Sequence, residues 1–577
     1  MPTASRGSKR VDECDSGFYR PHCAKQKPKA QAKAQPAKNA KCQGQTLERR
    51  TIPVEPASWR ADSSVSDRPL PRFYLHDTGG ADFSAVSSEL RERIGSGLAE
   101  ETVPVSLSQY LVDMPVIESL RTHPRRVSKP EGAEWHILSA MPLASRLLAL
   151  LHANVTADSG HVCNRQSVCH ALPHGFGPEL REHTDRLSRQ LAYLRGDTHW
   201  RTPKVPFLLL STGININEEL PTEFIRELVR RDARVGPVLL AGVDRSGPHA
   251  MAVANLPLLR RMIILPHVAS PECTRYAGRI AAPRHVRSHA RKSAPDGTDR
   301  RATSSASASA AVTSSSTSST SSSAAPGSLH AADAASSSRH GFLFHGHNGR
   351  FDNGARAAVR DIGSNLRAGY DFQMLRLQTV GGADNSSYAA THRVHRLVSQ
   401  HTTRRMLNAS MCFAPQGDSD SSRRLFDALA TGCVPIIVKV IGGRPRETML
   451  TNLPFHHTIK WAGVSRLLAA AGASLNDRFA PASGWKMTCR IAEAAQLDGW
   501  HDDAHMLELM RSNAVSAFRA SLDVEGNPRG VANALLRELA YVLTDLPHTF
   551  YLPPPHLVPS GMRAWPNMTE KQWLWTK

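Results

Sequence analysis

The 577 residues are too many for one ordinary hydrophobic core, and they leave room for about two domains of ~200 residues once polar segments are set aside. The net charge of +20 favours phosphate-bearing or otherwise anionic partners, but it does not choose among nucleic acid, anionic polysaccharide and nucleotide sugar. Aromatic residues make up only 6% of the chain and do not interleave with basic residues as base-stacking platforms do, which argues against a nucleic-acid-binding protein.

Residues 1–69 are expected to form a disordered stem, because the stretch from Ala24 is rich in Lys, Gln, Ala and Pro and poor in large apolar side chains. Within it, residues 13–24 have the Cys, Gly-aromatic, Cys spacing of the last loop of an EGF-like module, a disulfide unit of oxidising compartments. Two interpretations stay open: a remnant of such a module, or two unrelated cysteines in a tail. No run of ~18 apolar residues occurs, so we expect membrane attachment only through a signal anchor upstream of this sequence.

The first folded domain is predicted over residues 70–283. Short apolar runs alternate there with helical stretches such as Glu223–Arg231, which is typical of an open parallel sheet covered on both faces. The expected strands are Arg72–His76, Trp135–Ser139, Phe207–Leu210, Val238–Ala241 and Met262–Leu265.

Residues 284–340, dominated by Ser, Ala and Thr, are expected to form a disordered linker because such a stretch builds no core. A second α/β domain is predicted over residues 341–545, and residues 546–577 are a C-terminal tail. The fold class is therefore α/β, with two Rossmann-like domains that face a cleft, where ligands bind at the carboxyl ends of strands. The second domain's expected elements are the strands Phe342–Phe344, Phe372–Leu375, Met411–Ala414 and Pro435–Val438, and the helix Ser422–Ala430.

Residues 411–438 have the pattern of an anion-binding strand-turn-helix unit. A buried strand ends at Pro415, and a helix begins near Ser422 with its free backbone N–H groups at the strand ends. Unsatisfied donors and the helix dipole both favour a negative ligand there. Arg423 and Arg424 can add charge-assisted hydrogen bonds to a pyrophosphate.

The same unit supplies a polar side chain for a sugar hydroxyl. Asp427 lies one helical turn after Arg423, on or near the same face, where it can accept hydrogen bonds from a ribose. Gly417 and Ser419 lie in the turn before the helix, and Gly432 ends the helix.

The spacing of these residues resembles the signature of the exostosin family. A weaker resemblance extends over about residues 70 to 545, and includes Gly346, Arg350, Gly354 and Arg356 as a strand and basic loop of the donor domain. The residues that match the signature are Pro415, Gly417, Asp418, Ser419, Ser422, Arg423, Arg424, Leu425, Asp427, Ala428, Gly432, Cys433 and Pro435.

This resemblance implies the two-domain GT-B arrangement and transfer of a sugar from a nucleoside diphosphate sugar to a glycan or glycoprotein acceptor, with inversion and without a metal or other cofactor. It also implies a location in the Golgi lumen. The residues it suggests for donor binding are Gly346, Arg350, Arg356, Gly417, Ser419, Ser422, Arg423, Arg424 and Asp427.

An inverting transfer needs a general base for the acceptor hydroxyl, and we expect it at a strand end of the first domain. His76 with Asp77 is the preferred candidate, because a neighbouring acid can raise the basicity of an imidazole. Asp244 and His267, which follow later strands, are the alternatives.

Other interpretations remain open. Residues 418–420, Asp-Ser-Asp, could be read as a metal-binding Asp-x-Asp motif. The histidine pairs 345/347, 392/395 and 456/457 have short spacings, but no Cys or acidic partner is evident that completes a tetrahedral zinc site.

Cys412 and Cys433 suit buried packing, with a disulfide as the alternative in an oxidising compartment. Lys439 departs from the family pattern, which keeps an inactive scaffold or partner subunit as a further alternative.

Overall fold

The computed structural model describes residues 58–60, 68–78, 82–94, 109–153, 177–213, 216–243, 262–280, 341–347, 355–375, 399–415, 422–440, 453–470 and 484–545. The segment 13–24, the stretch 284–340 and the tail 546–577, for which the sequence predicts an EGF-like remnant, a linker and a tail, lie outside these residues.

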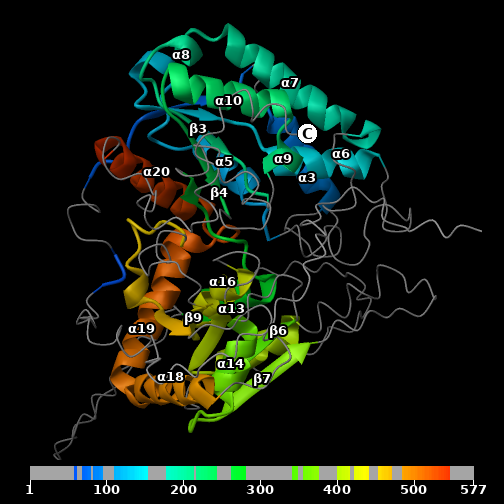
Figure 1. Ribbon diagram of the computed structural model, residues 1–577. Coiled ribbons are helices and arrows are strands. Elements are labelled where there is room, and N and C mark those ends of the chain that lie inside the picture. Colours follow the sequence, from blue (N-terminus) through cyan, green and yellow to red (C-terminus); the bar gives the residue numbers. More distant parts are fainter. Residues whose placement is uncertain are drawn as a thin grey trace, which may run out of the picture.

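The described strands of the first unit form a parallel sheet in chain order, β1-β2-β3-β4-β5 (Figure 1). Every residue of β2, β3 and β4 is buried, because both faces of the sheet are covered. All five strands were predicted, with bounds within two residues. They are β1 (Phe73–His76), β2 (Trp135–Leu138), β3 (Phe207–Leu210), β4 (Val238–Gly242) and β5 (Ile263–Ile264).

Helices connect these strands and pack on the sheet. Their order along the chain is α3 (Ser84–Ile94), α5 (Asp113–Arg121), the 3₁₀ turn η2 (Pro130–Gly132), α6 (Pro142–His152), the 3₁₀ turn η4 (Pro178–Leu180), α7 (Arg181–Gly196), α8 (Thr198–Arg201), α9 (Ile216–Glu219), α10 (Thr222–Arg234) and α13 (Pro271–Ile280).

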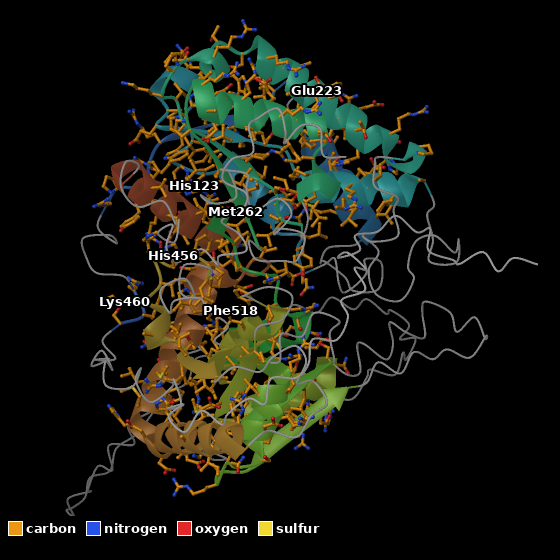
Figure 2. All side chains as sticks on the ribbon, in the orientation of Figure 1. His123, Glu223, Met262, His456, Lys460 and Phe518 are labelled. Carbon is orange, nitrogen blue, oxygen red and sulfur yellow. A yellow bond between two sulfur atoms is a disulfide. The ribbon has the colours of Figure 1, made fainter. Side chains whose placement is uncertain are left out.

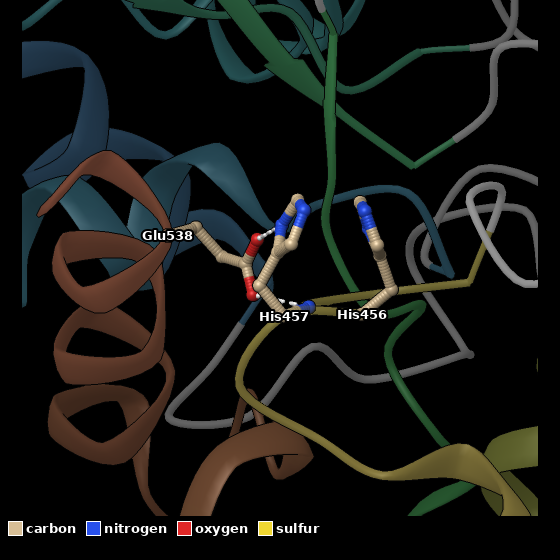
Figure 3. Close-up of side chains that lie close together, drawn as sticks. All are labelled: His456, His457 and Glu538. Carbon is tan, nitrogen blue, oxygen red and sulfur yellow. Dashed lines mark hydrogen bonds and ion pairs between the residues drawn. The ribbon is translucent and has the colours of Figure 1, made fainter. Parts of the chain in front are cut away.

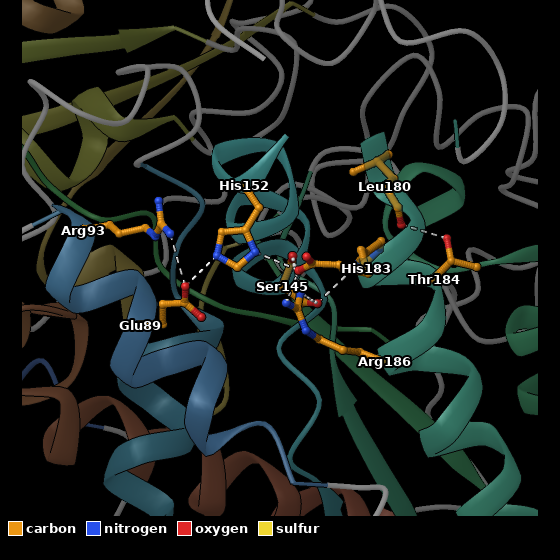
Figure 4. A network of polar contacts seen from close by, with 9 residues as sticks. Glu89, Arg93, Ser145, His152, Leu180, His183, Thr184 and Arg186 are labelled. Carbon is orange, nitrogen blue, oxygen red and sulfur yellow. Dashed lines mark hydrogen bonds and ion pairs between the residues drawn. The ribbon is translucent and has the colours of Figure 1, made fainter. Parts of the chain in front are cut away.

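A polar network joins three of these helices (Figure 4). His152, at the end of α6, lies with Nε2 2.5 Å from Glu89 of α3 and with Nδ1 2.8 Å from Glu182 of α7. Arg186 donates to Glu182 over 2.8 Å. The network fixes α3, α6 and α7 to one another.

The second sheet is also parallel, but its described strands run in the order β10-β9-β8-β6-β7. The chain adds β7 on one side of β6 and then returns to add β8 on the other, so the strand order reverses between β6 and β8, as in doubly wound folds. The strands are β6 (Phe342–His347), β7 (Tyr370–Leu375), β8 (Met411–Pro415), β9 (Val434–Val440) and β10 (Arg466–Ala470).

The expected α/β class with two parallel sheets is therefore confirmed, although β10 was not predicted. The helical elements of this part are α14 (Ala355–Gly363), residues 399–408, α16 (Arg423–Thr431), the 3₁₀ turn η5 (Trp461–Gly463), α18 (Gly484–Asp502), α19 (Ala504–Ala517), the π-helical turn η7 (Phe518–Leu522) and α20 (Pro528–Asp545).

Two helices cross between the units. Helix α13 follows the first sheet but packs on α16, and α20 follows the second sheet but packs on α5. Between α20 and the residues after α5, His123 Nε2 lies 2.8 Å from the Oδ1 atom of Asn533, and Arg529 donates to the Thr122 carbonyl. One apolar cluster runs across the junction, with Phe518 from the second half of the chain among its members (Figure 2).

A disulfide joins Cys412 of β8 to Cys433, which directly precedes β9. The two cysteines are 21 residues apart in the chain, and both are buried. Between the alternatives of simple packing and a disulfide, the structure has the disulfide. The disulfide links strand β8, which precedes α16, to Cys433, which follows the helix. It therefore connects the two ends of the strand-turn-helix unit covalently.

Replacing both cysteines, as Cys412→Ala with Cys433→Ala, should lower the free energy of unfolding of the second unit by about 3 kcal/mol, because the unfolded chain loses a closed loop of about twenty residues. Urea unfolding under non-reducing conditions measures this. Cys273→Ala, which removes another buried cysteine, serves as the matched control. An unfolding midpoint of the double variant that equals the wild-type midpoint would show that the disulfide does not form in solution.

Candidate functional site

The reversal of strand order in the second sheet marks a ligand position. In open α/β sheets, ligands bind outside the carboxyl ends of the strands at the point where the order reverses. Here that point lies between β6 and β8, and the helices that follow these strands are α14 and α16. The first sheet has no reversal among its described strands. The second sheet therefore holds the better candidate site.

Two arginines from these helices lie near each other. Arg356 is in the first turn of α14, and Arg424 is in the first turn of α16 with its guanidinium 5.1 Å from the ring centroid of Phe344 in β6. Burial and, to a smaller extent, the charge of Arg356 lower the pKa of Arg424 to about 10. The two guanidinium groups thus repel each other, and a bound anion would relieve the repulsion.

Helix α16 begins as the sequence predicts. Its N-cap residue Ser422 has extended backbone angles, and its side chain makes no capping hydrogen bond to the helix. The helix ends at Gly432, whose φ of +68° lies in the left-handed region that glycine adopts without strain. The first turn thus offers backbone N–H groups and the macrodipole to an anion in addition to the arginine charges.

Asp427, one turn into α16, connects the donor-side helix to the first unit. Its carboxylate accepts hydrogen bonds from the Ser270 backbone N–H over 2.6 Å and from the Ser270 hydroxyl over 2.9 Å. Burial raises the pKa of Asp427, while the nearby charge of Arg423 opposes that rise. A carboxylate has about four acceptor positions, so Ser270 does not exhaust its capacity for a ribose hydroxyl.

Ser270 is a member of the site that the sequence interpretation missed. It directly precedes α13 and accepts backbone hydrogen bonds from Cys273 and Thr274 in the first turn of that helix. A local signal existed, because Ser followed by Pro271 and Glu272 is a typical helix start. What the chain could not show is that this helix start meets Asp427.

The structure brings together Arg356, Ser422, Arg423, Arg424 and Asp427 from the expected donor-binding set. Gly346 lies near the end of β6, in register with Met374 of β7. Arg350, Gly417 and Ser419, and the Asp-x-Asp residues 418–420, lie outside the described residues.

The preferred catalytic base needs a correction. His76 is at the end of β1, as expected, but its side chain has no exposed surface. Its Nε2 lies 2.9 Å from His136 Nδ1, and its Nδ1 lies 3.3 Å from the hydroxyl of Tyr193 in α7. Burial and the neighbouring His136 lower its pKa to about 3. A fully buried imidazole is not directly accessible to an acceptor hydroxyl in this conformation, which argues against His76 as the base.

The other candidates for the general base differ in how far their side chains are exposed to solvent. The Asp77 carboxylate is 12% exposed and accepts a hydrogen bond from Arg126 over 2.9 Å, with Arg121 at 3.9 Å. His267 is buried at the junction, where its ring packs 5.6 Å from that of Phe426 in α16. Asp244 lies outside the described residues.

The buried histidines of the first unit predict an acid-sensitive fold. Burial lowers the pKa of His76 and of His183 to about 3 and that of His136 to about 4. Between pH 6.5 and 5 the unfolded chain takes up protons there that the folded chain does not, so stability falls as the pH falls. Burial raises the pKa of Asp113 to about 7, which acts in the opposite direction.

We expect a net loss of about 3 kcal/mol of unfolding free energy between pH 6.5 and 5. Urea unfolding of the first unit, followed at both pH values, measures it. His136→Phe should reduce the loss, and the exposed control His505→Ala should leave it unchanged. A free energy that does not change over this range would contradict the neutral state of these histidines.

Comparison with known proteins finds a family match over the second sheet. Residues 317–474 match the family model of the Exostosin GT47 domain, a range that contains β6 to β10 and α16. A search of curated proteins found no match to the chain. In the described part of the chain, no helix combines the length and apolar character that crossing a membrane requires. The resemblance noted in the first unit lies outside the matched residues. The segment that carries the second sheet is therefore similar to the Exostosin GT47 domain over residues 317–474.

Proposed function

We propose that the protein transfers a sugar from a nucleoside diphosphate sugar to a glycan or glycoprotein acceptor, and that the donor lies at the strand-order reversal of the second sheet. The observation that carries this proposal is the gathering of Arg356, Arg423 and Arg424 at the starts of α14 and α16. A diphosphate presents negative charge over a similar span and accepts several hydrogen bonds, which planar guanidinium groups donate well.

This arrangement supports a metal-independent reaction. The leaving nucleoside diphosphate gains negative charge as the sugar departs, and positive groups aimed at that charge stabilise the transition state. Three arginines and a helix N-terminus can supply that stabilisation. We further propose inversion at the anomeric carbon, with the acceptor approaching from the side of the first unit.

Asp427 is proposed to bind the ribose. It lies on α16, one turn from Arg423, and therefore on the nucleoside side of a diphosphate held at the helix start. For the general base we retain Asp77, because its carboxylate is partly exposed at the end of β1, whereas His76 and His267 are buried. Its contacts with Arg121 and Arg126 hold it in place.

The disulfide supports a location in an oxidising compartment such as the Golgi lumen. Structural disulfides persist in secretory compartments and are rare in the cytosol. The Cys412–Cys433 bond closes the unit that carries the donor-site arginines, so we propose that the protein matures where this bond can form.

Replacing both arginines of α16, as Arg423→Ala with Arg424→Ala, should weaken the binding of a nucleoside diphosphate by at least tenfold, or ~1.4 kcal/mol, because two charge-assisted contacts are lost. Isothermal titration with uridine and guanosine diphosphates, tested separately, measures this. The change should be similar for inorganic pyrophosphate, since the arginines contact the phosphates.

Two further variants make this test specific. Arg404 and Arg405 form a matched, exposed pair on the neighbouring helical segment 399–408, and replacing them by Ala should leave binding within twofold. Asp427→Asn should weaken nucleoside diphosphate binding but not pyrophosphate binding. A folded Arg423/Arg424 double variant with unchanged affinity would rule out the proposed donor site. Wild-type protein that binds the donor but transfers no sugar would indicate an inactive scaffold.

A further inference from the structure

Two adjacent histidines meet a distant carboxylate near the boundary between the units. His456 and His457 lie in the turn that precedes η5, and Glu538 lies on α20, 81 residues after His457 (Figure 3). The sequence suggested no acidic partner for this histidine pair, because Glu538 is remote along the chain. The fold brings this carboxylate next to the histidine pair.

The carboxylate of Glu538 is buried and held in place by the turn. One oxygen accepts hydrogen bonds from the backbone N–H groups of His457 and Thr458, over 3.1 and 2.9 Å, and from the Thr458 hydroxyl over 2.8 Å. The other oxygen lies 2.8 Å from His457 Nδ1. The first oxygen is thus occupied by the turn, and the second faces the His457 imidazole.

The backbone places both imidazoles on the same side. Adjacent residues of an extended chain point in opposite directions, but the centroids of these two rings are 3.7 Å apart. Phe455, directly before them, has a φ of +48°, a left-handed conformation that costs a bulky residue of order 1–3 kcal/mol. The turn over these residues thus places the two rings side by side next to Glu538.

We propose that His456, His457 and Glu538 bind one divalent d-block ion of the zinc class, with water in the fourth position. One ligand atom from each residue lies within 4.8 Å of the other two, and modest side-chain rotation brings such a set to the ~3.3 Å that separates the ligands of a tetrahedral ion. Two imidazoles with one carboxylate favour Zn²⁺, Co²⁺ or Ni²⁺ over Mg²⁺ and Ca²⁺, which prefer oxygen ligands.

The position of the site suggests a structural role. The turn also contacts the first unit, where Phe455 N–H donates to the Ile264 carbonyl of β5 over 3.4 Å, and the described residues 58–60, where Lys460 N–H donates to the Trp59 carbonyl. Helix α20 packs on α5. An ion between the turn and α20 would clamp this junction. The proposal uses none of the proposed donor-site residues, so it stands or falls separately from the proposed function.

The test is titration of EDTA-treated full-length protein with ZnCl₂ and, separately, CoCl₂. Wild-type protein should bind one equivalent more than His456→Ala at low micromolar concentration, and the Co²⁺ form should show the visible absorption of a tetrahedral site. Zn²⁺ should raise the Tm of the wild type and not that of His456→Ala. MgCl₂ should do neither.

His456→Ala is the principal variant because the Glu538 contacts described above come from His457 and Thr458, so the anchored turn should survive it. Glu538→Gln is the second variant, and should weaken Zn²⁺ binding at least tenfold if it folds. His505→Ala, an exposed histidine on α19, controls for adventitious binding and should behave as wild type. Equal Zn²⁺ stoichiometry and equal Tm shift in wild type and His456→Ala would overturn the proposal and leave His457 and Glu538 as a hydrogen-bonded pair only.

Discussion

Like charges placed at the starts of two helices are the constraint on which the second unit depends. Burial lowers the pKa of Arg424, the charge of Arg356 lowers it in addition, and Asp427 partly opposes both effects. An anionic ligand at this place, as proposed, would offset the repulsion. The strand order places both helices at the same end of the sheet, so the repulsion follows from the topology itself and not from a flexible surface loop.

The same region holds the two units together. Asp427 accepts both hydrogen bonds of Ser270, and α13 begins from Ser270 and packs on α16. A nucleotide that engages Asp427 would therefore act on a side chain that also bonds to the first unit. If the donor binds as proposed, this one carboxylate would couple donor binding to the position of the first unit.

The sequence predicted those features that are local. The strand ending at Pro415, the helix after Ser422 and its end at Gly432 each have a signal within a few residues, so these elements of the candidate anion site could be predicted from the sequence. Strand β10 could not be predicted from the sequence. Its residues, Arg-Leu-Leu-Ala-Ala at 466–470, are rich in helix formers and become a strand only through pairing with β9. His76 shows a different limit of prediction from the sequence. The end of its strand was predicted, but not that its side chain faces α7 and the core.

Contacts between distant segments account for the rest. Neither the packing of α20 on α5 nor the approach of Glu538 to His456 and His457 has a local signal, because each joins residues far apart in the chain. Composition and motifs describe one segment at a time. The junction between the units, which connects the donor side to the first sheet, exists only in the folded molecule.

The central claim is that the donor binds at the strand-order reversal of the second sheet. Its most direct test is amide hydrogen exchange measured with and without a saturating nucleoside diphosphate. The account predicts slower amide exchange in the first turns of α14 and α16, whose N–H groups would face the phosphates, and little change along β1 to β4. Protection confined to the first sheet, or no protection at the start of either helix at a nucleotide concentration shown to saturate the protein, would contradict it.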